Sequence, residues 1–305
     1  MINTCVTLLN LVDERRCRTL ARLEAIAKRQ GVDVLLLGAF ARDLLFWHTH
    51  GISCHRGTMD VDIVVQLQDW TAYNRFRSAL QSIGFKSTEA AHPEKLLDTD
   101  TGVEVDLLPF GDIAEDGKTV VWPQDDSRWS VIGIQDAYDH ALRFEIIVDG
   151  ITRSIRFVSA SGLVLLKIVA IYDRPEARYK KDTADIGFVI DHYLGIGNKV
   201  RMESHPHEDI LRAVDGDLDR ATARLLGRDI SEMVSSDARA YIVNLLKQEV
   251  RSRSTCRFTQ GLQESLCKGS FSRARIIVGE ILDGLMWTHP ARVKAGDGSR
   301  DTKHE

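Results

Sequence analysis

TMDVDIVV, residues 58–65, is the segment that decides the fold of this chain. If it forms a strand, its side chains alternate between two faces, so Asp60 and Asp62 share one face while Val61 and Ile63 pack behind them. Carboxylates beside Val and Ile are disfavoured unless a cation or hydrogen-bond donors compensate, and repulsion between the two adds to the cost. The segment therefore indicates a cation site or, in the simpler alternative, the solvent face of an edge strand.

Two further segments favour the cation site. LLLGAFARD, residues 35–43, places Gly38 between an apolar strand and a helix, where free backbone N–H groups and the helix dipole favour phosphate. VEVDLL, residues 103–108, is a second apolar strand that brings Asp106 to the same side. Three such carboxylates suit Mg2+ (or Mn2+), which binds oxygen ligands and holds a nucleoside triphosphate through its phosphates. We therefore expect Asp60, Asp62 and Asp106 to bind metal.

In order and spacing, these segments resemble the nucleotidyltransferase superfold of DNA polymerase beta, and more closely its branch of AbiEii/AbiGii toxins from abortive-infection and toxin–antitoxin systems. The first motif of that superfold is a glycine turn followed by a strand with Asp-x-Asp, often preceded by Arg or Thr/Ser. Gly38-Ala39 and RGTMDVD, residues 56–62, occupy those places. Ala39 departs from the common Gly or Ser, which removes a hydroxyl and keeps the backbone N–H.

The resemblance extends to a Lys, an Arg and a Lys-Asp-x-x-Asp element, here Lys167, Arg174 and residues 181–185. It implies that Lys167 contacts the triphosphate and that Asp185 orients or deprotonates an attacking hydroxyl. The full nucleotide-binding set is Gly38, Ala39, Arg42, Thr58, Lys167, Arg174 and Lys181, and the catalytic set is Asp60, Asp62, Asp106 and Asp185. Two plainer alternatives remain. Asp182 and Asp185 could lie on a solvated helix face, and Arg42 could pair with Asp43 or Asp60.

The activity implied by the resemblance is nucleotidyl transfer. An acceptor hydroxyl attacks the alpha-phosphorus of a nucleoside triphosphate (NTP), and pyrophosphate leaves. The resemblance favours tRNA, another RNA or a protein as acceptor, and a toxin with a cognate antitoxin as partner. A small-molecule acceptor, as in aminoglycoside nucleotidyltransferases, and a catalytically silent nucleotide-binding or regulatory module are the alternatives. The net charge of −4 argues against strong nonspecific binding of nucleic acid.

Composition places the 305-residue chain among globular proteins, with 44% hydrophobic and 28% charged residues. No apolar run is long enough to cross a bilayer and no secretory signal is visible, so we expect a cytoplasmic protein without membrane contact. Five scattered cysteines do not indicate a disulfide framework. His48, His50, Cys54 and His55 lack a zinc spacing and are interpreted as a loop, and DGDLD, residues 215–219, is interpreted as a helix N-cap.

The predicted fold class is α/β (α+β), with a nucleotidyltransferase-type mixed sheet flanked by helices and followed by a mainly helical domain. The predicted domains are a catalytic core with an N-terminal helix (1–158), a helical domain that closes the nucleotide cleft (159–290) and a disordered tail (291–305). The first half is predicted as helix 11–29, strand 32–37, helix 40–49, strand 59–66, helix 69–83, strands 95–99 and 103–109, a polar loop 111–130 and a hairpin at 149–150. Helices are then expected at 159–172, 181–194, 207–213, 217–226, 236–250, 258–267 and 271–287.

Overall fold

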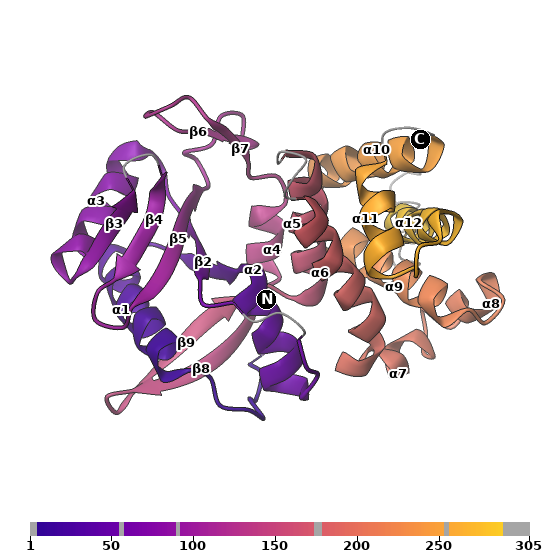
Figure 1. Ribbon diagram of the computed structural model, residues 1–305, viewed down its shortest axis with the longest axis horizontal. Helices are drawn as coiled ribbons and strands as arrows, with labels where there is room; N and C mark the ends of the chain where they lie inside the picture. The colour runs from indigo at the N-terminus through magenta and orange to yellow at the C-terminus, as the bar shows by residue number, and fades with distance from the viewer. Residues whose placement is uncertain (1–4, 55–57, 90–91, 174–178, 253–255, 289–305) are drawn as a thin grey trace, which may run out of the picture. The chain divides into compact units, whose positions relative to one another are not determined.

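The computed structural model describes residues 5–54, 58–89, 92–173, 179–252 and 256–288 (Figure 1). The chain forms two compact units, residues 1–173 and 174–305. Helix α5 (Ala160–Asp173), which the sequence analysis assigns to the second domain, belongs to the first unit. Within the described residues, no helix is long and apolar enough to cross a membrane. The proposed tail, residues 291–305, lies outside the described residues.

The first unit is built on a seven-stranded mixed sheet with the strand order β3-β4-β5-β2-β1-β9-β8. Strand pairs β2/β5 and β1/β9 are parallel, and the other neighbours are antiparallel. The strands are β1 (Val34–Leu37), β2 (Val61–Gln66), β3 (Phe85–Glu89), β4 (His92–Asp98), β5 (Val103–Phe110), β8 (Leu142–Val148) and β9 (Ile151–Phe157). A separate small sheet pairs β6 (Thr119–Val121) with β7 (Arg128–Ser130).

Helices flank this sheet. They are α1 (Glu14–Gln30), α2 (Gly38–Asp43), which continues as the π-helix η1 (Leu44–His48), α3 (Trp70–Ser82), α4 (Ile134–Asp139) and α5. Helices α1 and α3 contact each other, and α1 also contacts β5, β8 and β9. Helix α5 contacts α2, α4 and β7.

Helix α1 shows how the sequence sets an element's ends. The Asp13 side chain accepts hydrogen bonds from the backbone N–H groups of Arg15 and Arg16, which caps the first turn. Gly31 ends the helix in the left-handed conformation, with φ of 65°, where a residue without Cβ is favoured. Both hairpins predicted at glycine turns are present: β4–β5 turns at Gly102, and β8–β9 turns at Asp149-Gly150, both with positive φ.

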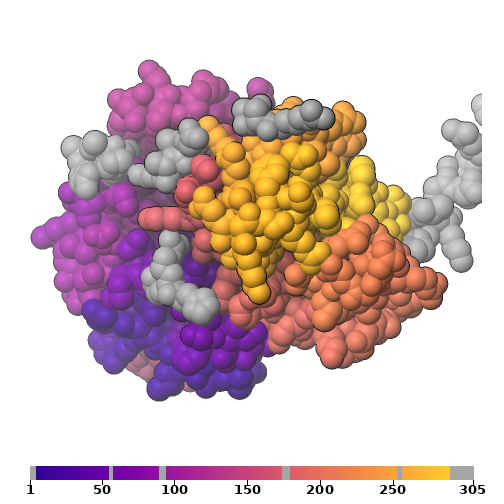
Figure 2. Space-filling model, turned by 45° about the vertical axis from the view of Figure 1, so that its right-hand side comes forward, coloured from indigo at the N-terminus to yellow at the C-terminus, as the bar shows by residue number. Residues whose placement is uncertain are grey.

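Helices are the only regular secondary structure in the described residues of the second unit. Its elements are α6 (Tyr179–His192), η3 (Tyr193–Ile196), α7 (Asn198–Met202), α8 (Ile210–Ala213), α9 (Leu218–Met233), α10 (Ser236–Arg251), α11 (Arg257–Ser265) and α12 (Phe271–Met286). Helices α9 and α12 approach closely because Gly227 and Gly284 face each other, and a Cβ on Gly227 would lie 2.9 Å from the Cα of Gly284. The orange to yellow surface in Figure 2 belongs to the C-terminal helices of this unit.

The predicted fold class, a mixed sheet with flanking helices followed by a mainly helical part, is confirmed. The local predictions differ from the structure in several places, among them helices α4 and α7, which were not predicted. Strand β3 was missed, because FKSTE has few apolar residues and its side chains at positions 86–88 are exposed. The segment 111–130 is more than a polar loop: it holds the β6–β7 hairpin, and Trp122 is 2% exposed and contacts Trp70, Tyr73 and Trp129. The DGDLD segment does cap a helix, since Asp217 accepts a hydrogen bond from the Arg220 N–H at the start of α9.

Candidate active site

The candidate site is a row of residues that crosses four neighbouring strands. Leu37 on β1 pairs with Asp62 on β2, Asp62 pairs with Asp106 on β5, and Asp106 pairs with Lys95 on β4. Register partners in a sheet project from the same face. The row therefore places the two carboxylates side by side, although they are far apart in the sequence.

Alternation along β2 explains why this face carries the polar groups. Val61, Ile63 and Val65 are at most 1% exposed, which makes the opposite face of β2 part of the core. Asp62, Val64 and Gln66 lie on the other face, where Val64 is fully buried and the two polar residues on either side of it are half-buried. The period-two pattern of the strand thus makes one face wholly apolar and places polar groups only on the other.

Gly38 brings the chain close to Asp62. It follows β1, opens helix α2 and has φ of 70°, a conformation that L side chains rarely adopt. A Cβ at this position would overlap Oδ2 of Asp62 and lie 2.6 Å from its Cγ. Only glycine therefore fits between the end of β1 and the Asp62 carboxylate. Ala39 follows on the first turn of α2 and is half-buried.

Asp60 lies one residue before β2 rather than within it, because the strand begins at Val61. Its side chain is exposed, and its backbone N–H donates to Oγ1 of Thr58 at 3.3 Å. Asp60 is therefore at the edge of the site, on the turn that enters β2. The preceding motif residues Arg56 and Gly57 lie outside the described residues.

Arg16 is a site-supporting residue that the sequence reasoning missed. It reaches from α1 and donates from Nη1 to the carbonyl oxygen of Thr58 at 3.3 Å. Its guanidinium also lies 4.2 Å from the centroid of the buried Phe40 ring on α2. The Arg16 side chain thus contacts both the segment before Asp60 and the helix after the glycine turn. A lone arginine in an amphipathic helix gives no signal of this role in the sequence.

Lys95 is the second residue that was missed, and it lies in the site itself. Its Nζ donates to Oδ1 and Oδ2 of Asp106 at 3.1 and 3.4 Å. Partial burial acts to lower the pKa of Lys95, but the hydrogen bond and the charge of Asp106, with Glu104 and Glu94, outweigh it and raise the pKa above its usual value. Lys95 is therefore a cation throughout the neutral pH range. The register of β4 on β5, which the sequence does not reveal, was the missing signal.

Arg42 was predicted to bind nucleotide, and the structure places it in the core of α2. It is 3% exposed, and its Nη2 and Nε donate to Oδ1 of Asp43 at 2.6 and 3.1 Å. This is the structural pairing that the sequence analysis held open as its alternative.

The remaining predicted residues are divided between the two units. Lys167 is half-buried on α5, in the same unit as the sheet. Lys181 is exposed on α6, while Asp182 and Asp185 on that helix are 2% and 4% exposed, so the solvated-face alternative was wrong for these two acids. Arg174 lies outside the described residues. Roles for Lys167, Lys181 and Asp185 in nucleotide binding stay predictions.

The number and placement of the carboxylates determine what kind of metal site these residues could form. Among the residues that the structure describes, no three His, Cys, Asp or Glu side chains are arranged to hold a metal ion. Asp62 and Asp106 are nevertheless adjacent on parallel strands, and Mg2+ commonly takes one or two protein carboxylates and completes its shell with phosphate oxygens and water. The chemistry of Asp62 and Asp106 would suit a hard divalent cation that is shared with phosphate oxygens. The site does not fit a preformed cage of three carboxylates.

The interpretation of the histidine cluster before β2 as a loop was wrong for His48 and His50, which lie in the helical turns that follow α2, and Cys54 lies outside any helix or strand. His48 is 5% exposed, and its Nδ1 lies 3.1 Å from the carbonyl oxygen of Asn10, while Nδ1 of His50 lies 2.8 Å from that of Leu45. Burial is the main cause that lowers the pKa of His48. These ring nitrogens hold the N-terminal segment and the end of η1 in place. His55 lies outside the described residues.

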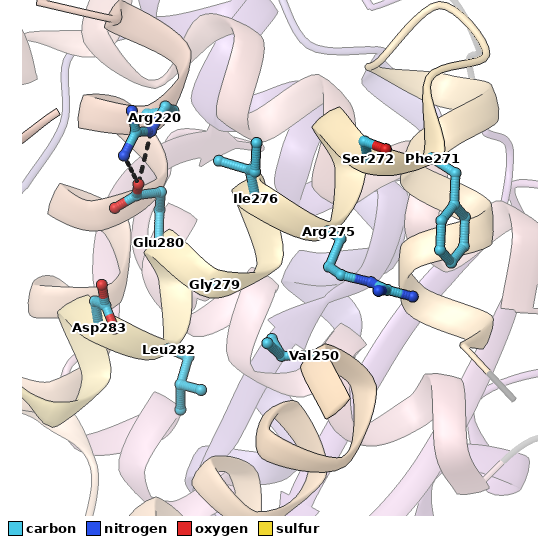
Figure 3. Close-up of a pocket in the computed structure, with 10 residues that line it drawn as sticks. All are labelled: Arg220, Val250, Phe271, Ser272, Arg275, Ile276, Gly279, Glu280, Leu282 and Asp283. Atoms are coloured by element: carbon cyan, nitrogen blue, oxygen red, sulfur yellow. Dashed lines mark hydrogen bonds and ion pairs between the residues drawn. The ribbon is translucent and has the colours of Figure 1, made fainter. Parts of the chain in front are cut away.

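A separate pocket of about 530 Å3 lies in the second unit, along α12 (Figure 3). Arg220 donates to Glu280 at 2.7 Å at one end, and Arg275 stacks on Phe271 at the other, 4.9 Å from its ring centroid. Val250 of α10 and Ile276, Gly279 and Leu282 of α12 line it between these ends. None of the predicted site residues described by the structure lines this pocket.

Comparison with known proteins finds no sequence match and only weak structural similarity. No family model matches the chain, and no curated protein matches its sequence. Similar solved structures include the antibiotic-resistance factor ANT(2'')-Ia in solution, with 14% identity over 67% of this chain and 92% of that one and a TM-score of 0.35. A nucleotidyltransferase-like antigenic protein from Paracoccidioides brasiliensis is 18% identical over 68% and 95%, with a TM-score of 0.36. A CCA-adding enzyme in complex with CTP is 12% identical over 94% and 82%, with a TM-score of 0.26. These structural neighbours are nucleotidyltransferases, and we base the proposal below on the residues of the site alone.

Proposed function

We propose that this chain is a metal-dependent nucleotidyltransferase that transfers NMP from an NTP to an acceptor hydroxyl. The observation that carries the proposal is the adjacency of Asp62 and Asp106 beside a glycine that no other residue can replace. Lys95 neutralises part of the charge on Asp106, and a hard divalent cation is a ligand that the two neighbouring carboxylates could share with phosphate oxygens. The glycine turn beside them brings backbone N–H groups of the following helix close to the same carboxylates.

The proposed reaction is an in-line displacement. The acceptor oxygen forms a bond to the alpha-phosphorus, the bond to the pyrophosphate oxygen breaks, and the hydroxyl proton passes to a carboxylate of the site or to water. A divalent cation held by Asp62 and Asp106 would supply charge neutralisation on the phosphates and a lower pKa for the acceptor hydroxyl. The chain's own contribution is position: the N–H groups after Gly38 bind phosphate oxygens, and Asp60 lies at the edge, where a third carboxylate can reach the nucleotide.

The finer roles follow the resemblance found in the sequence. In this proposal Lys167, Arg174 and Lys181 neutralise the triphosphate, Asp185 orients the acceptor, and the acceptor is tRNA, another RNA or a protein. The biological role is that of a toxin held in check by an antitoxin. A small-molecule acceptor or a silent nucleotide-binding module would leave the same sheet and the same row of residues.

The test is transfer of label from each of the four NTPs, labelled at the alpha-phosphate, in Mg2+ with total tRNA and cell extract. The wild type is compared with Asp62→Asn and with Glu145→Gln, a matched loss of one negative charge at an exposed position on β8. We expect label on an RNA or protein band with wild type and Glu145→Gln, and a loss of at least about 100-fold with Asp62→Asn. Equal labelling by wild type and Asp62→Asn would refute the proposal. Label on a small molecule would keep the reaction and change the acceptor.

A further inference from the structure

We propose that Lys95 is a built-in counter-ion that competes with the divalent cation for Asp106 and keeps metal binding weak until a nucleotide arrives. The inference deepens the proposed function and rests on its metal site. It starts from a contact between two side chains: the ammonium of Lys95 reaches both carboxylate oxygens of Asp106, at 3.1 and 3.4 Å. A cation coordinated by the same oxygens would have to displace that ammonium.

The backbone keeps Lys95 within reach of Asp106. The two residues are direct partners in the antiparallel β4–β5 pair, so their Cβ atoms stay close, and the lysine side chain can make or break the contact. The two side chains are 33% and 26% exposed, so solvent only partly screens the pair. A divalent cation and an ammonium on one carboxylate repel each other, and the more strongly held of the two excludes the other.

The lysine also has somewhere to go. Its long side chain is flexible, and Glu104, two residues before Asp106 on the same face of β5, is exposed. When a metal with its nucleotide takes Asp106, the ammonium can turn toward Glu104 or water without becoming a buried, unpaired charge. The exchange is therefore reversible, as a counter-ion role requires.

Linkage gives the measurable consequence. Moving Lys95 away from Asp106 costs free energy, which makes the free energy of metal binding less favourable, so the metal alone binds weakly. A metal–nucleotide complex gains further contacts at the glycine turn, which offset this cost. Removing the ammonium removes that cost. A lysine that only supported the fold would have no such effect on metal affinity.

The experiment is a calorimetric titration of the protein with Mn2+ alone, without nucleotide or acceptor. Wild type is compared with Lys95→Met, Lys95→Arg and Lys86→Met, in which Lys86 is an exposed lysine on the neighbouring strand β3. We expect Lys95→Met to bind Mn2+ about 10-fold more tightly than wild type, Lys95→Arg to resemble wild type, and Lys86→Met to be unchanged. Thermal melting of each variant shows whether it is folded. If Lys95→Met is not folded, Lys95→Arg is compared with wild type instead.

Unchanged or weaker Mn2+ binding by Lys95→Met would overturn the inference, as would tighter binding by Lys95→Arg if only that variant folds. An equal gain in Mn2+ affinity by Lys86→Met would also overturn it. So would the absence of saturable Mn2+ binding by wild type and by either Lys95 variant. The titration contains no nucleotide, so it is independent of the labelling experiment. Tighter binding by Lys95→Met without any transfer of label would remove the proposed function and keep the counter-ion. Transfer of label together with an unchanged Mn2+ affinity of Lys95→Met would support the proposed function and remove the counter-ion role.

Discussion

Gly38 and Asp62 lie so close that the first carbon of any side chain on Gly38 would overlap the Asp62 carboxylate. Gly38, with its left-handed backbone conformation, is thus in direct contact with the carboxylate of strand β2. Gly31 offers a natural comparison, since it has a similar φ of 65° and a Cβ added to it would meet nothing within 4 Å. The two glycines separate the cost of backbone conformation from the cost of the contact.

Gly38→Ala should therefore be more damaging than Gly31→Ala. We expect Gly31→Ala to lower the free energy of unfolding by about 1 kcal/mol through its left-handed backbone, and Gly38→Ala to lower it by about 2 to 4 kcal/mol because overpacking adds to the strain. Gly38→Ala should also abolish label transfer. Urea denaturation of both variants measures the difference, and equal losses would show that the contact with Asp62 relaxes freely.

Arg16→Ala should impair activity through the segment before Asp60. The variant loses the hydrogen bond to the Thr58 carbonyl and the stacking on Phe40. We expect a loss of about 1 to 2 kcal/mol in stability and a fall of about 10-fold in label transfer, since a small misplacement of a site group is costly. Arg18→Ala is the control, because Arg18 pairs with the exposed Glu14 on the same helix. Similar activity losses for both arginines would contradict the role given to Arg16.

Asp217 predicts a pH dependence in the second unit. Its hydrogen bonds with Arg273 are the main cause that lowers its pKa from 3.8 to about 2. Because the folded-state pKa is depressed, the stabilisation is fully present above about pH 4 and is lost as pH falls through about 2. Asp217→Asn keeps a capping side chain and removes the charge, so we expect it to cost about 1 to 2 kcal/mol at neutral pH.

The measurement for Asp217 is urea denaturation of wild type and Asp217→Asn between neutral pH and pH 2. The difference in unfolding free energy should shrink toward zero at the acid end. Asp219→Asn is the matched control, since Asp219 also accepts from Arg273 but is 57% exposed, and we expect a change below about 0.5 kcal/mol. A difference for Asp217→Asn that does not vary with pH would mean that its charge is not the cause.

Glu249→Gln should destabilise the second unit. Glu249 is 1% exposed and accepts hydrogen bonds from the N–H groups of Phe258 and Thr259 and from the Thr259 hydroxyl, which caps the start of α11. Glutamine offers one acceptor oxygen in place of two, so we expect a loss of about 2 to 3 kcal/mol. Glu264→Gln, at an exposed pair with Lys180, should change stability by less than about 0.5 kcal/mol. Thermal denaturation compares the two, and a tie would show that the buried carboxylate is not a cap.

The local patterns predicted much of this molecule, and the long-range pairing explains what they missed. Val61, Ile63 and Val65 alternate with Asp62 in the sequence itself, so the strand and its polar face could be read directly. Lys95 could not be assigned to the site, because its neighbourhood depends on the register of β4 against β5. The position of Arg16 over Phe40 depends in the same way on packing between helices far apart in sequence.

Buried acids in the second unit were misread for a related reason. Asp182 and Asp185 are spaced like residues on an exposed helix face, yet both are at most 4% exposed. Another face of the same helix packs against α11, where Gly261 would clash with Thr183 if it carried a side chain. Composition along one helix does not tell which of its faces a partner helix will cover. A small residue such as Gly261 is visible in the sequence, but its partner is not.

The row from Leu37 through Asp62 and Asp106 to Lys95 also bears on how the sheet assembles. A slip of one residue between β2 and β5 would turn Asp62 or Asp106 toward the apolar face, where Val61 and Val105 are now fully buried. A carboxylate buried there without a partner would make the mispaired sheet unstable. The acids of the candidate site thus disfavour incorrect registers between β2 and β5. Substituting both with apolar residues would allow the two strands to pair in more than one register during folding.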